Sequence, residues 1–186
     1  MNDDDAIHAN HHVQHNYPAA VKFCALCGAE MALRTILPDR KRMRACPRCG
    51  FVFFPSPKLV AGCLVVNAGR VLLLKRGFEP ALGMWTFPGG FVEFAERAID
   101  AAVRETFEEV GLQVDPGPLL GVYTDPVNLN AQVVVYLATP KGGEPTRTEE
   151  AVEVRFFEPD AIIWESLAFE STREALTDWL QSVKRQ

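Results

Sequence analysis

The sequence has no long hydrophobic run: no stretch approaches the roughly 18 apolar residues that a membrane-spanning helix needs. Its first twenty residues, MNDDDAIHANHHVQHNYPAA, are acidic and polar, which is not the basic and then apolar pattern of a secretory signal. We therefore predict a soluble, cytoplasmic protein in which residues 1–20 form a disordered tail. A metal site is the less favoured interpretation of the four histidines in this tail, which are His8, His11, His12 and His15.

The chain also lacks an overall excess of positive charge. Its formal net charge of -5 argues against a protein that binds nucleic acid by general electrostatic attraction. The charge is nevertheless uneven, because residues 22–58 hold eight Lys or Arg against two acidic residues, a local charge of +6. The remaining residues carry 11 basic and 22 acidic side chains, or -11. A hydrophobic content of 48% over 186 residues suffices for one solid domain and a small, chemically distinct module.

Four of the five cysteines form two closely spaced pairs, Cys24-x2-Cys27 and Cys46-x2-Cys49, separated by eighteen residues. This spacing is typical of a four-cysteine zinc site, and the turns resemble the knuckles of a zinc ribbon. A segment this short cannot bury enough apolar surface to fold alone, whereas structural zinc supplies on the order of 10 kcal/mol. We therefore expect a zinc ribbon over residues 21–56, with a structural zinc because four thiolates leave no open position. Two disulfides are the disfavoured alternative.

Two further features near the ribbon have simpler interpretations. The segment RKRMR, Arg40 to Arg44, is a basic patch that either grips phosphates or forms a solvated hairpin arm. The solvated arm is favoured, because no aromatic residues interleave with the charges to stack on bases. Cys63 lies in the apolar run LVAGCLVV and is expected to be a buried strand residue.

Residues 57–186 show a mixture of strand and helix patterns. The runs LVAGCLVV and RVLLLKR flank NAG, which predicts a hairpin with Asn67 and Gly69 in the turn. In MWTFPGGFVEF, we expect Pro88, Gly89 and Gly90 to end a strand in an exposed loop.

Helical spacing follows this loop, from Ala95 to Val110, and Gly111 is expected to end the helix. Its candidate buried positions are Ala95, Ala98, Ala102, Phe107 and Val110. Strand candidates come next, namely LLGVYT, AQVVVYLAT and VEVRFFE.

A terminal helix is predicted from the capping-box sequence STRE at Ser171. Its expected apolar face consists of Leu176, Trp179, Leu180 and Val183. The order of strands, one internal helix, more strands and a terminal helix favours an α/β sandwich over a doubly wound sheet.

The segment VRETFEEVGL places three carboxylates, Glu105, Glu108 and Glu109, on one face of the predicted internal helix. Like charges at this spacing destabilise a helix, and Arg104 is the nearby cation at suitable spacing. A divalent cation such as Mg²⁺ would relieve the repulsion, because it binds carboxylate oxygens and keeps waters and substrate phosphates as further ligands. Without its surroundings, the segment would instead be read as a solvated acidic face.

The surroundings resemble the Nudix box, written G-x5-E-x7-R-E-U-x-E-E-x-G-U, where U is aliphatic. The matching residues are Gly90, Glu96, Arg104, Glu105, Thr106, Glu108, Glu109, Gly111 and Leu112. Thr106 is the one departure, and its β-branched side chain has the size of valine, so we expect the packing to survive. The agreement of every charged and glycine position makes a solvated acidic face the weaker interpretation.

The resemblance extends over almost the whole chain from Phe23 onward. The four-cysteine ribbon, SPK at Ser56, MWTFPGG and EVRFFEPDAIIWESLAF look like a Nudix branch that cleaves ADP-ribose or FAD. The implied fold is a Nudix α/β/α sandwich with a mixed sheet, preceded by a small zinc-ribbon module. NADH pyrophosphatases also join a ribbon to a Nudix domain, but their Pro-Trp-Pro-Phe-Pro element is missing here. Pro126 lies where ADP-ribose pyrophosphatases tend to carry a proline.

The resemblance implies Mg-dependent (or Mn-dependent) hydrolysis of the pyrophosphate bond in a nucleoside diphosphate linked to another moiety. Glu105, Glu108 and Glu109, with the backbone carbonyl of Gly90, would hold the metal ions. Bound there, the ions would neutralise the phosphates and activate a water molecule.

Other acidic residues have implied roles in support of this reaction. In the family, the residues at Glu96 and Arg104 pair to brace the loop against the helix. The general base is either a box carboxylate or an acid from the segment EPTRTEEAVEVR. Glu150 is preferred there over Glu149 and Glu153, because related sequences place a glutamate just before this strand. Solvated loop charge is the alternative for all three.

Further alternatives stay open. Trp85, Phe91 and Tyr123 could stack on an adenine, although each residue type is more often part of a core. The chain could also hydrolyse NADH or capped RNA 5′ ends, with Arg40 to Arg44 guiding the strand. A non-catalytic nucleotide sensor is disfavoured, because every box carboxylate is present. A nucleotide-derived small molecule is the expected partner, nucleic acid a less favoured one, and a homodimer is suggested only by the resemblance.

Overall fold

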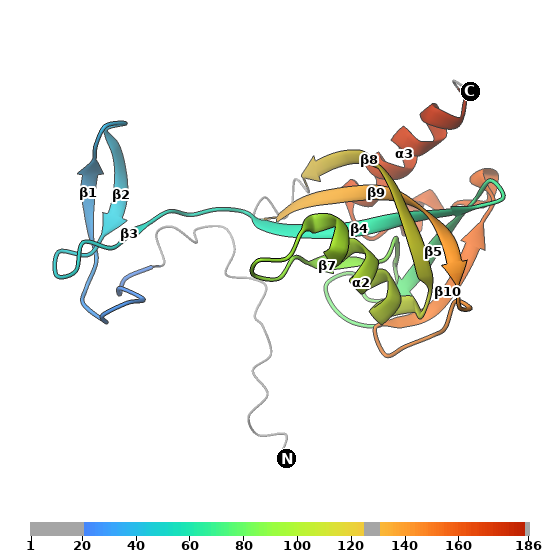
Figure 1. Ribbon diagram of the computed structural model, residues 1–186, viewed down its shortest axis with the longest axis horizontal. Coiled ribbons are helices and arrows are strands. Elements are labelled where there is room, and N and C mark those ends of the chain that lie inside the picture. Colours follow the sequence, from blue (N-terminus) through green and yellow to red (C-terminus); the bar gives the residue numbers. More distant parts are fainter. Residues whose placement is uncertain (1–20, 125–130, 185–186) are drawn as a thin grey trace, which may run out of the picture. The chain divides into compact units, whose positions relative to one another are not determined.

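The computed structural model describes residues 21–124 and 131–184, and within these the chain divides into two compact units at Ser56 and Pro57. Figure 1 shows both units. The expected tail at residues 1–20 and the proline at Pro126 lie outside the described residues. No helix in the described part of the chain is long and apolar enough to cross a membrane.

The first unit is a small antiparallel sheet with the strand order β1-β2-β3. Its strands are β1 (Ala32–Ile36), β2 (Lys41–Ala45) and β3 (Val52–Phe53). Among its described residues, the buried apolar side chains are few: Cys24, Met31 and Cys46 form one cluster, and Ala45 is buried as well. A core this small cannot by itself offset the entropy of ordering the unit, so the unit needs a further source of stability.

The second unit is built on a mixed sheet with the main strand order β10-β5-β4-β9-β8. Of the named strand pairs, β4 and β9 are parallel and the others are antiparallel. The short strands β6 and β7 pair antiparallel with β5 and β4, respectively. The strands are β4 (Lys58–Asn67), β5 (Arg70–Arg76), β6 (Trp85–Thr86), β7 (Gly89–Phe91), β8 (Gln113–Thr124), β9 (Ala131–Gly142) and β10 (Ala151–Phe157). The helical elements are α2 (Ala98–Val110), η3 (Pro159–Ala161), η4 (Trp164–Ser166) and α3 (Glu170–Lys184).

Each face of this sheet packs against one helix (Figure 1). Side chains of a strand alternate between faces, so Leu64 of β4 packs with α3, whereas Cys63 and Val65 pack with α2. Strand β5 alternates in the same way, with Leu73 on the α3 side and Leu74 on the α2 side. The predicted α/β/α sandwich with a mixed sheet is therefore confirmed.

Several local predictions need correction. The β4–β5 hairpin forms, but its two turn residues are Ala68 and Gly69, both with positive φ, while Asn67 pairs with Arg70 in the ladder. The prediction of an exposed loop at Pro88, Gly89 and Gly90 is wrong, because Pro88 is buried and both glycines belong to β7. β7 lies so close to β4 that a Cβ at Gly89 would overlap the backbone of the neighbouring strand.

The internal helix begins at Ala98 rather than at Ala95, which is exposed with a φ of 64°. The predicted burial of Phe107 is wrong, because this residue is 53% exposed. Gly111 ends the helix as predicted, with a left-handed φ of 68° and its N–H donating to the carbonyl of Phe107. Thr106 is fully buried, and its hydroxyl donates to the carbonyl of Ala102 at 2.7 Å, so the unusual residue packs without an unsatisfied group.

The terminal helix begins at Glu170, one residue before the predicted cap. Ser171 is therefore a buried helical residue instead of a cap, and its neighbour Thr172 shares a hydrogen bond of 2.9 Å with Thr86 of β6. Trp179 is buried as expected, but Val183 is 54% exposed. Cys63 is fully buried in β4, and burial raises the pKa of its thiol to about 11.

Candidate active site

The candidate active site forms where α2 meets the glycine strand β7. The backbone N–H of Gly89 donates to Oε2 of Glu109 at 2.8 Å. The carboxylate of Glu105 lies directly against Gly90, where a Cβ would overlap it. Two consecutive glycines thus let two carboxylates of the helix approach the backbone of the strand, which a larger residue would prevent.

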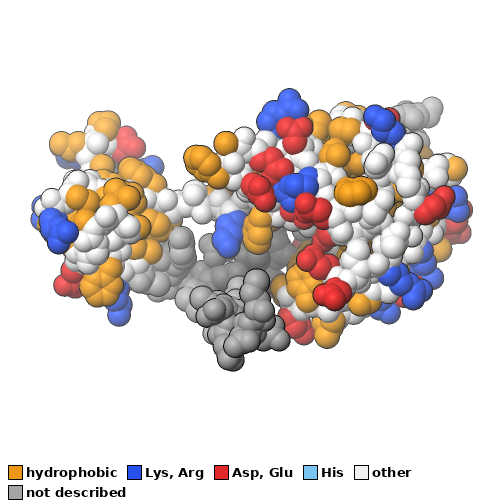
Figure 2. All heavy atoms as spheres, turned by 60° about the horizontal axis from the view of Figure 1, so that its bottom comes forward, with side chains coloured by type: hydrophobic (Ala, Val, Ile, Leu, Met, Phe, Trp, Pro, Cys, Tyr) orange, Lys and Arg blue, Asp and Glu red, His pale blue; other side chains and the backbone are white. Residues whose placement is uncertain are grey.

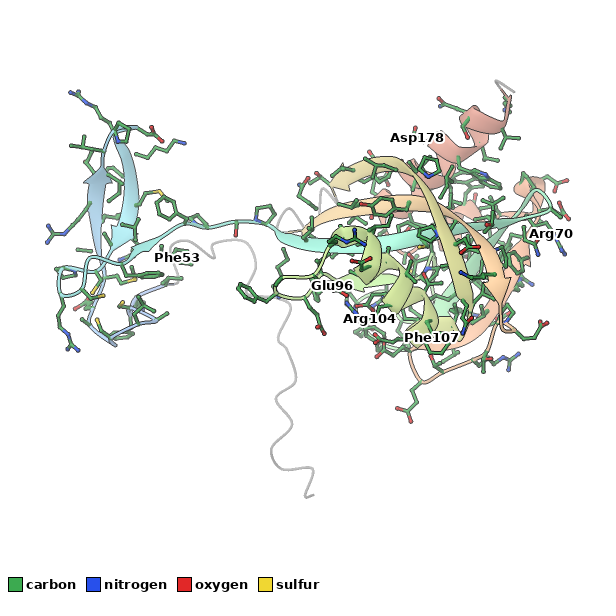
Figure 3. All side chains as sticks on the ribbon, in the orientation of Figure 1. Phe53, Arg70, Glu96, Arg104, Phe107 and Asp178 are labelled. Atoms are coloured by element: carbon green, nitrogen blue, oxygen red, sulfur yellow. The ribbon has the colours of Figure 1, made fainter. Side chains whose placement is uncertain are left out.

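Arg104 connects the acidic residues of the helix to the loop before it. Its Nε and Nη2 each donate to Glu96 at 2.9 Å, and Nη2 also donates to the carbonyl of Phe91 at 3.1 Å. Its Nη1 donates to Glu105 at 2.7 Å and to Glu108 at 3.0 Å. Figure 3 shows Arg104 and Glu96 side by side, and Figure 2 shows acidic side chains gathered beside basic ones on the larger unit. These contacts raise the pKa of Arg104 and, through the guanidinium, lower the pKa of Glu96.

The three box carboxylates lie in different environments. Glu109 is only 7% exposed, and burial raises its pKa to about 8, with the N–H of Gly89 opposing the shift. Burial also raises the pKa of Glu105, which the hydrogen bond from Arg104 counteracts. Glu108 is at the solvent side of the group, with a side chain 55% exposed. The structure therefore brings Glu105 and Glu109 against β7 and links Glu108 to them through Arg104.

This donor set fits a hard divalent cation. Carboxylate oxygens and a backbone carbonyl are the ligands that Mg²⁺ and Mn²⁺ prefer. Glu109 is a buried carboxylate that accepts one hydrogen bond among the described residues, from the N–H of Gly89, and its negative neighbours Glu105 and Glu150 raise its pKa further. A bound cation would remove this electrostatic penalty, so Glu105, Glu108, Glu109 and the carbonyl of Gly90 are the residues suited to hold it.

Among the candidate general bases, Glu150 is the one whose charge acts on the box carboxylates Glu105 and Glu109. It immediately precedes β10, and its carbonyl accepts from the N–H of Gly77 at 2.8 Å. Burial is the main cause of the raised pKa of Glu105 and of Glu109, and the negative charge of Glu150 is a further cause in both. Glu153 instead forms a half-buried ion pair of 3.7 Å with Lys75, and Glu149 and Glu150 are both exposed.

Arg76, the last residue of β5, was not among the site residues predicted from the sequence. Its side chain is only 8% exposed, and its Nε donates to the carbonyl of Pro80 at 2.7 Å. Burial lowers its pKa, which the charges of Glu109, Glu150 and Glu79 oppose. Arg76 therefore lies within electrostatic reach of the box, although nothing in the run RVLLLKR distinguishes it from an ordinary strand-end arginine.

The aromatic candidates for adenine stacking separate into two groups. Trp85 is buried and packs edge-on against Phe157, with ring centroids 4.9 Å apart, so it belongs to the core. Tyr123 is buried too, and its hydroxyl donates to Asp178 at 2.9 Å. Phe91 is 53% exposed next to the box, with the Nζ of Lys58 4.7 Å from its ring centroid.

A cavity of about 450 Å³ lies between β8 and α3 and not at the box. Its lining residues are Val122, Tyr123, Glu170, Arg173, Glu174, Thr177 and Asp178. Among the described residues, no box carboxylate contributes to it. The chemistry of the side chains, and not the size of this cavity, therefore identifies the candidate site.

The first unit holds a second candidate metal site. The Sγ atoms of its four paired cysteines all lie within 4.8 Å of one another, with Cys24–Cys49 at 3.6 Å and Cys27–Cys46 at 3.5 Å. A tetrahedral zinc with Zn–S bonds of about 2.3 Å separates its sulfurs by about 3.8 Å, so the spacing fits zinc and is far longer than a disulfide bond of about 2.05 Å. The N–H of Cys49 contributes most to lowering the pKa of Cys46 to about 6, whereas burial and the three neighbouring sulfurs raise the pKa of Cys49.

Comparison with known proteins agrees with this geometry. Residues 56–180 match the NUDIX domain family. The crystal structure of a NUDIX hydrolase from Nitrosomonas europaea superposes with a TM-score of 0.74 and 34% sequence identity, covering 83% of this chain and 88% of that one. An ADP-ribose pyrophosphatase of Methanocaldococcus jannaschii is 34% identical over 105 residues, which are 55% of this chain and 62% of that protein.

A third relative is the NAD-capped RNA hydrolase NudC of Pseudomonas aeruginosa, 28% identical over 143 residues. The match covers 76% of this chain but only 49% of that protein, so the chain spans about half to two thirds of these curated relatives. The family match, in contrast, extends over most of the chain and includes the whole acidic helix with its glycine strand. The chain therefore belongs to the NUDIX domain family.

Proposed function

We propose that this protein hydrolyses the pyrophosphate bond of a nucleoside diphosphate linked to another moiety, with ADP-ribose or FAD as the favoured substrate and Mg²⁺ or Mn²⁺ as the metal. The observation that carries the proposal is the pair of carboxylates, Glu105 and Glu109, held against Gly89 and Gly90. The similarity to an ADP-ribose pyrophosphatase supports the substrate class.

Each box residue has a distinct part in this proposal. Glu105, Glu108, Glu109 and the carbonyl of Gly90 bind the metal, which, when bound, neutralises the diphosphate and lowers the pKa of a water molecule. The N–H of Gly89 fixes the orientation of Glu109. The hydrogen bonds from Gly89 and Arg104 orient the three carboxylates, which reduces the reorganisation needed during the reaction.

Two residues position the helix, and one accepts a proton. Arg104 holds Glu96, Glu105 and Glu108 together and so fixes the loop before α2 relative to the carboxylates. Glu150 is the preferred general base, because it is the candidate whose charge affects both Glu105 and Glu109. A base at this position would take up the proton of the water that attacks one phosphorus as the bridging P–O bond breaks.

The four cysteines of residues 21–56 are proposed to bind one structural zinc ion. The small apolar core of that unit and the tetrahedral spacing of its sulfurs support this assignment. Zinc with four thiolates has no free coordination position, so the ribbon would contribute no catalytic water.

The test of the hydrolase is a Glu108→Gln variant assayed against ADP-ribose and FAD with Mg²⁺. Glu108 is the most exposed box carboxylate, so the substitution removes a charge without leaving a buried cavity. We expect turnover to fall by about 100-fold or more, because charge stabilisation by a bound metal supplies much of the rate enhancement in such reactions. Glu165→Gln, an exposed change in η4, is the control that should retain normal turnover.

Two results would contradict the proposal. One is near-normal turnover by folded Glu108→Gln protein. The other is wild-type protein that cleaves no nucleoside diphosphate derivative across a panel of ADP-ribose, FAD, NADH and dinucleoside polyphosphates in Mg²⁺ or Mn²⁺. The second result would favour a nucleotide-binding regulator.

Hydrolysis of capped RNA 5′ ends is a second candidate, favoured by the match to an NAD-capped RNA hydrolase over 76% of the chain. The exposed side chains of Arg40, Lys41 and Arg42 in the β1–β2 hairpin form no ion pair among the described residues. If they guide RNA, the triple change to glutamine should weaken RNA binding and flatten its dependence on salt concentration. Equal RNA affinity of wild type and variant would rule out this role.

A further inference from the structure

The loop between β9 and β10 is attached to the C-terminal end of α2. The last carbonyls of a helix have no partner within the helix and need donors from elsewhere. Here the loop supplies two donors. The N–H of Thr146 donates to the carbonyl of Val110 at 2.8 Å, and the hydroxyl of Thr148 donates to the carbonyl of Glu109 at 3.0 Å. The position of this loop is therefore determined by the same helix that carries the box carboxylates.

Thr148 joins the end of this helix to the first residue of β10. A hydroxyl can donate and accept at once, and that of Thr148 donates to Glu109 while it accepts from the N–H of Ala151 at 3.0 Å. The N–H of Thr148 also donates to the carbonyl of Ala151 at 3.1 Å. Glu149 and Glu150 are the two residues between these partners. Thr148 therefore fixes both ends of the short segment that carries Glu150.

A second contact holds the same segment from the end of β5. The N–H of Gly77 donates to the carbonyl of Glu150 at 2.8 Å. A Cβ at Gly77 would overlap the backbone carbonyl of Glu149, so the strand end and the segment are in close contact. The side chain of Glu150 is exposed, so little packing restrains its carboxylate, and the backbone determines the region that it can reach.

We propose that Thr148 is a positioning residue, which holds the backbone of Glu150 at a fixed place relative to the proposed metal ligand Glu109. The inference rests on the proposed function for the role of Glu150 as the general base. Thr148 acts through Glu150 and takes no part in the proton transfer itself. A general base must lie within hydrogen-bond reach of the water that it deprotonates, so a shift of this segment by about 1 Å slows the reaction. The carboxylates of α2 keep their places in the helix, so metal binding is not affected.

The test compares variants of the full chain that differ in the Thr148 hydroxyl. Thr148→Val removes the hydroxyl and keeps the β-branched shape, whereas Thr148→Ser keeps the hydroxyl. We expect kcat for ADP-ribose with Mg²⁺ to fall by about 10- to 100-fold in Thr148→Val, with KM and Mn²⁺ affinity within about twofold of wild type. Thr148→Ser should stay near normal. The matched control is Thr177→Val in α3, which removes a hydroxyl that donates to the carbonyl of Arg173 at 2.8 Å and should keep normal kcat.

A double-mutant cycle with Glu150→Gln tests whether Thr148 acts through Glu150. If it does, Thr148→Val should cause no further loss of kcat in a chain that already carries Glu150→Gln. Fully additive losses would overturn the proposal, as would normal kcat in folded Glu150→Gln or in folded Thr148→Val. Thr148→Ala, which also lacks the hydroxyl, replaces Thr148→Val if that variant does not fold.

Hydrogen exchange of the Ala151 amide, measured by NMR, is a readout that does not need activity. Loss of its acceptor in Thr148→Val should speed this exchange by about tenfold, whereas Thr177→Val should leave it unchanged. Unchanged exchange in Thr148→Val would overturn the proposal whether or not the protein is a hydrolase. Faster exchange in a protein whose wild type cleaves no nucleoside diphosphate would show that Thr148 holds the segment. That result would nevertheless reject the proposed hydrolase, and with it the catalytic role of the segment.

Discussion

Arg104 donates hydrogen bonds to both carboxylate oxygens of Glu96, from Nε and Nη2, each at 2.9 Å. Glu96 accepts in addition from the N–H of Glu93, which lies in the loop before α2. The same guanidinium binds Glu105 and Glu108 through its Nη1. One arginine therefore couples the loop geometry to the position of the acidic residues, so the pair matters more for the site than an ordinary surface ion pair.

Breaking this pair should reduce activity more than stability. In a Glu96→Gln variant, Arg104 loses its bidentate partner, and Glu105 and Glu108 lose a fixed cation. We expect ADP-ribose turnover to fall by about 10- to 100-fold, because small displacements of catalytic groups have effects of this size. Arg97→Gln is the control, since the Arg97–Asp100 pair is also bidentate but exposed and remote from the carboxylates. An equal loss of turnover in both variants would show that the brace has no special role.

Glu109 should make the metal-free protein less stable as pH rises. Its folded pKa of about 8 lies above its ordinary value of 4.5, so between these pH values the folded state binds a proton that the unfolded state has released. The free energy of unfolding should therefore fall between about pH 5 and pH 8, by on the order of a few kcal/mol. Urea titrations without added Mg²⁺ across this range measure the slope, which Glu109→Gln should flatten and added Mg²⁺ should reduce. If the free energy of unfolding rises over this range in the wild type but falls in Glu109→Gln, the folded pKa of Glu109 does not lie above its ordinary value.

The position of the acidic helix was predictable, but its orientation was not. The box spacing and Gly111 indicated α2 and its end, and the hydrophobic alternation indicated the β4–β5 hairpin. The expected burial followed from the rule that apolar residues face the core, yet Glu109 is 7% exposed and Phe107 is 53% exposed. These two positions on a helix lie about 200° apart, so burying Glu109 necessarily turns Phe107 outward. A buried carboxylate here overrides the hydrophobic pattern.

Arg76 could not be found from the sequence for a different reason. Its burial depends on Phe169, which is 93 positions away in the chain and comes close only when η4 and α3 fold onto the sheet. The same holds for the glycines of β7, whose contacts with Glu105 and Glu109 need the strand and helix to be placed in three dimensions. Local propensity carries no information on such contacts.

Gly90→Ala should weaken metal binding with little loss of stability. An added Cβ would overlap the carboxylate of Glu105, which is the end of a flexible side chain and can move aside. We expect Mn²⁺ affinity, measured by electron paramagnetic resonance, to fall by about tenfold, as for changes that misorient a ligand. Gly142→Ala is the control, because its nearest atom, Oε1 of Gln113, would be 3.5 Å away. Wild-type Mn²⁺ affinity in folded Gly90→Ala would mean that Glu105 does not need its present position.

Zinc binding by the four cysteines should stabilise the fold of the first unit and leave the second unit unaffected. Cys46 is buried among the cluster sulfurs, so Cys46→Ser should remove one zinc ligand and most of the bound metal, measured as zinc per chain by mass spectrometry. Because the unit has only a small apolar core of its own, proteolysis should then cleave before Pro57 and leave residues 57–186 intact. Cys63→Ala, a change in β4 of the other unit, should keep one zinc per chain. A Cys46→Ser protein with full zinc content, or a metal-free wild type as resistant to protease as the zinc-bound form, would show that the ribbon is stabilised by something other than zinc.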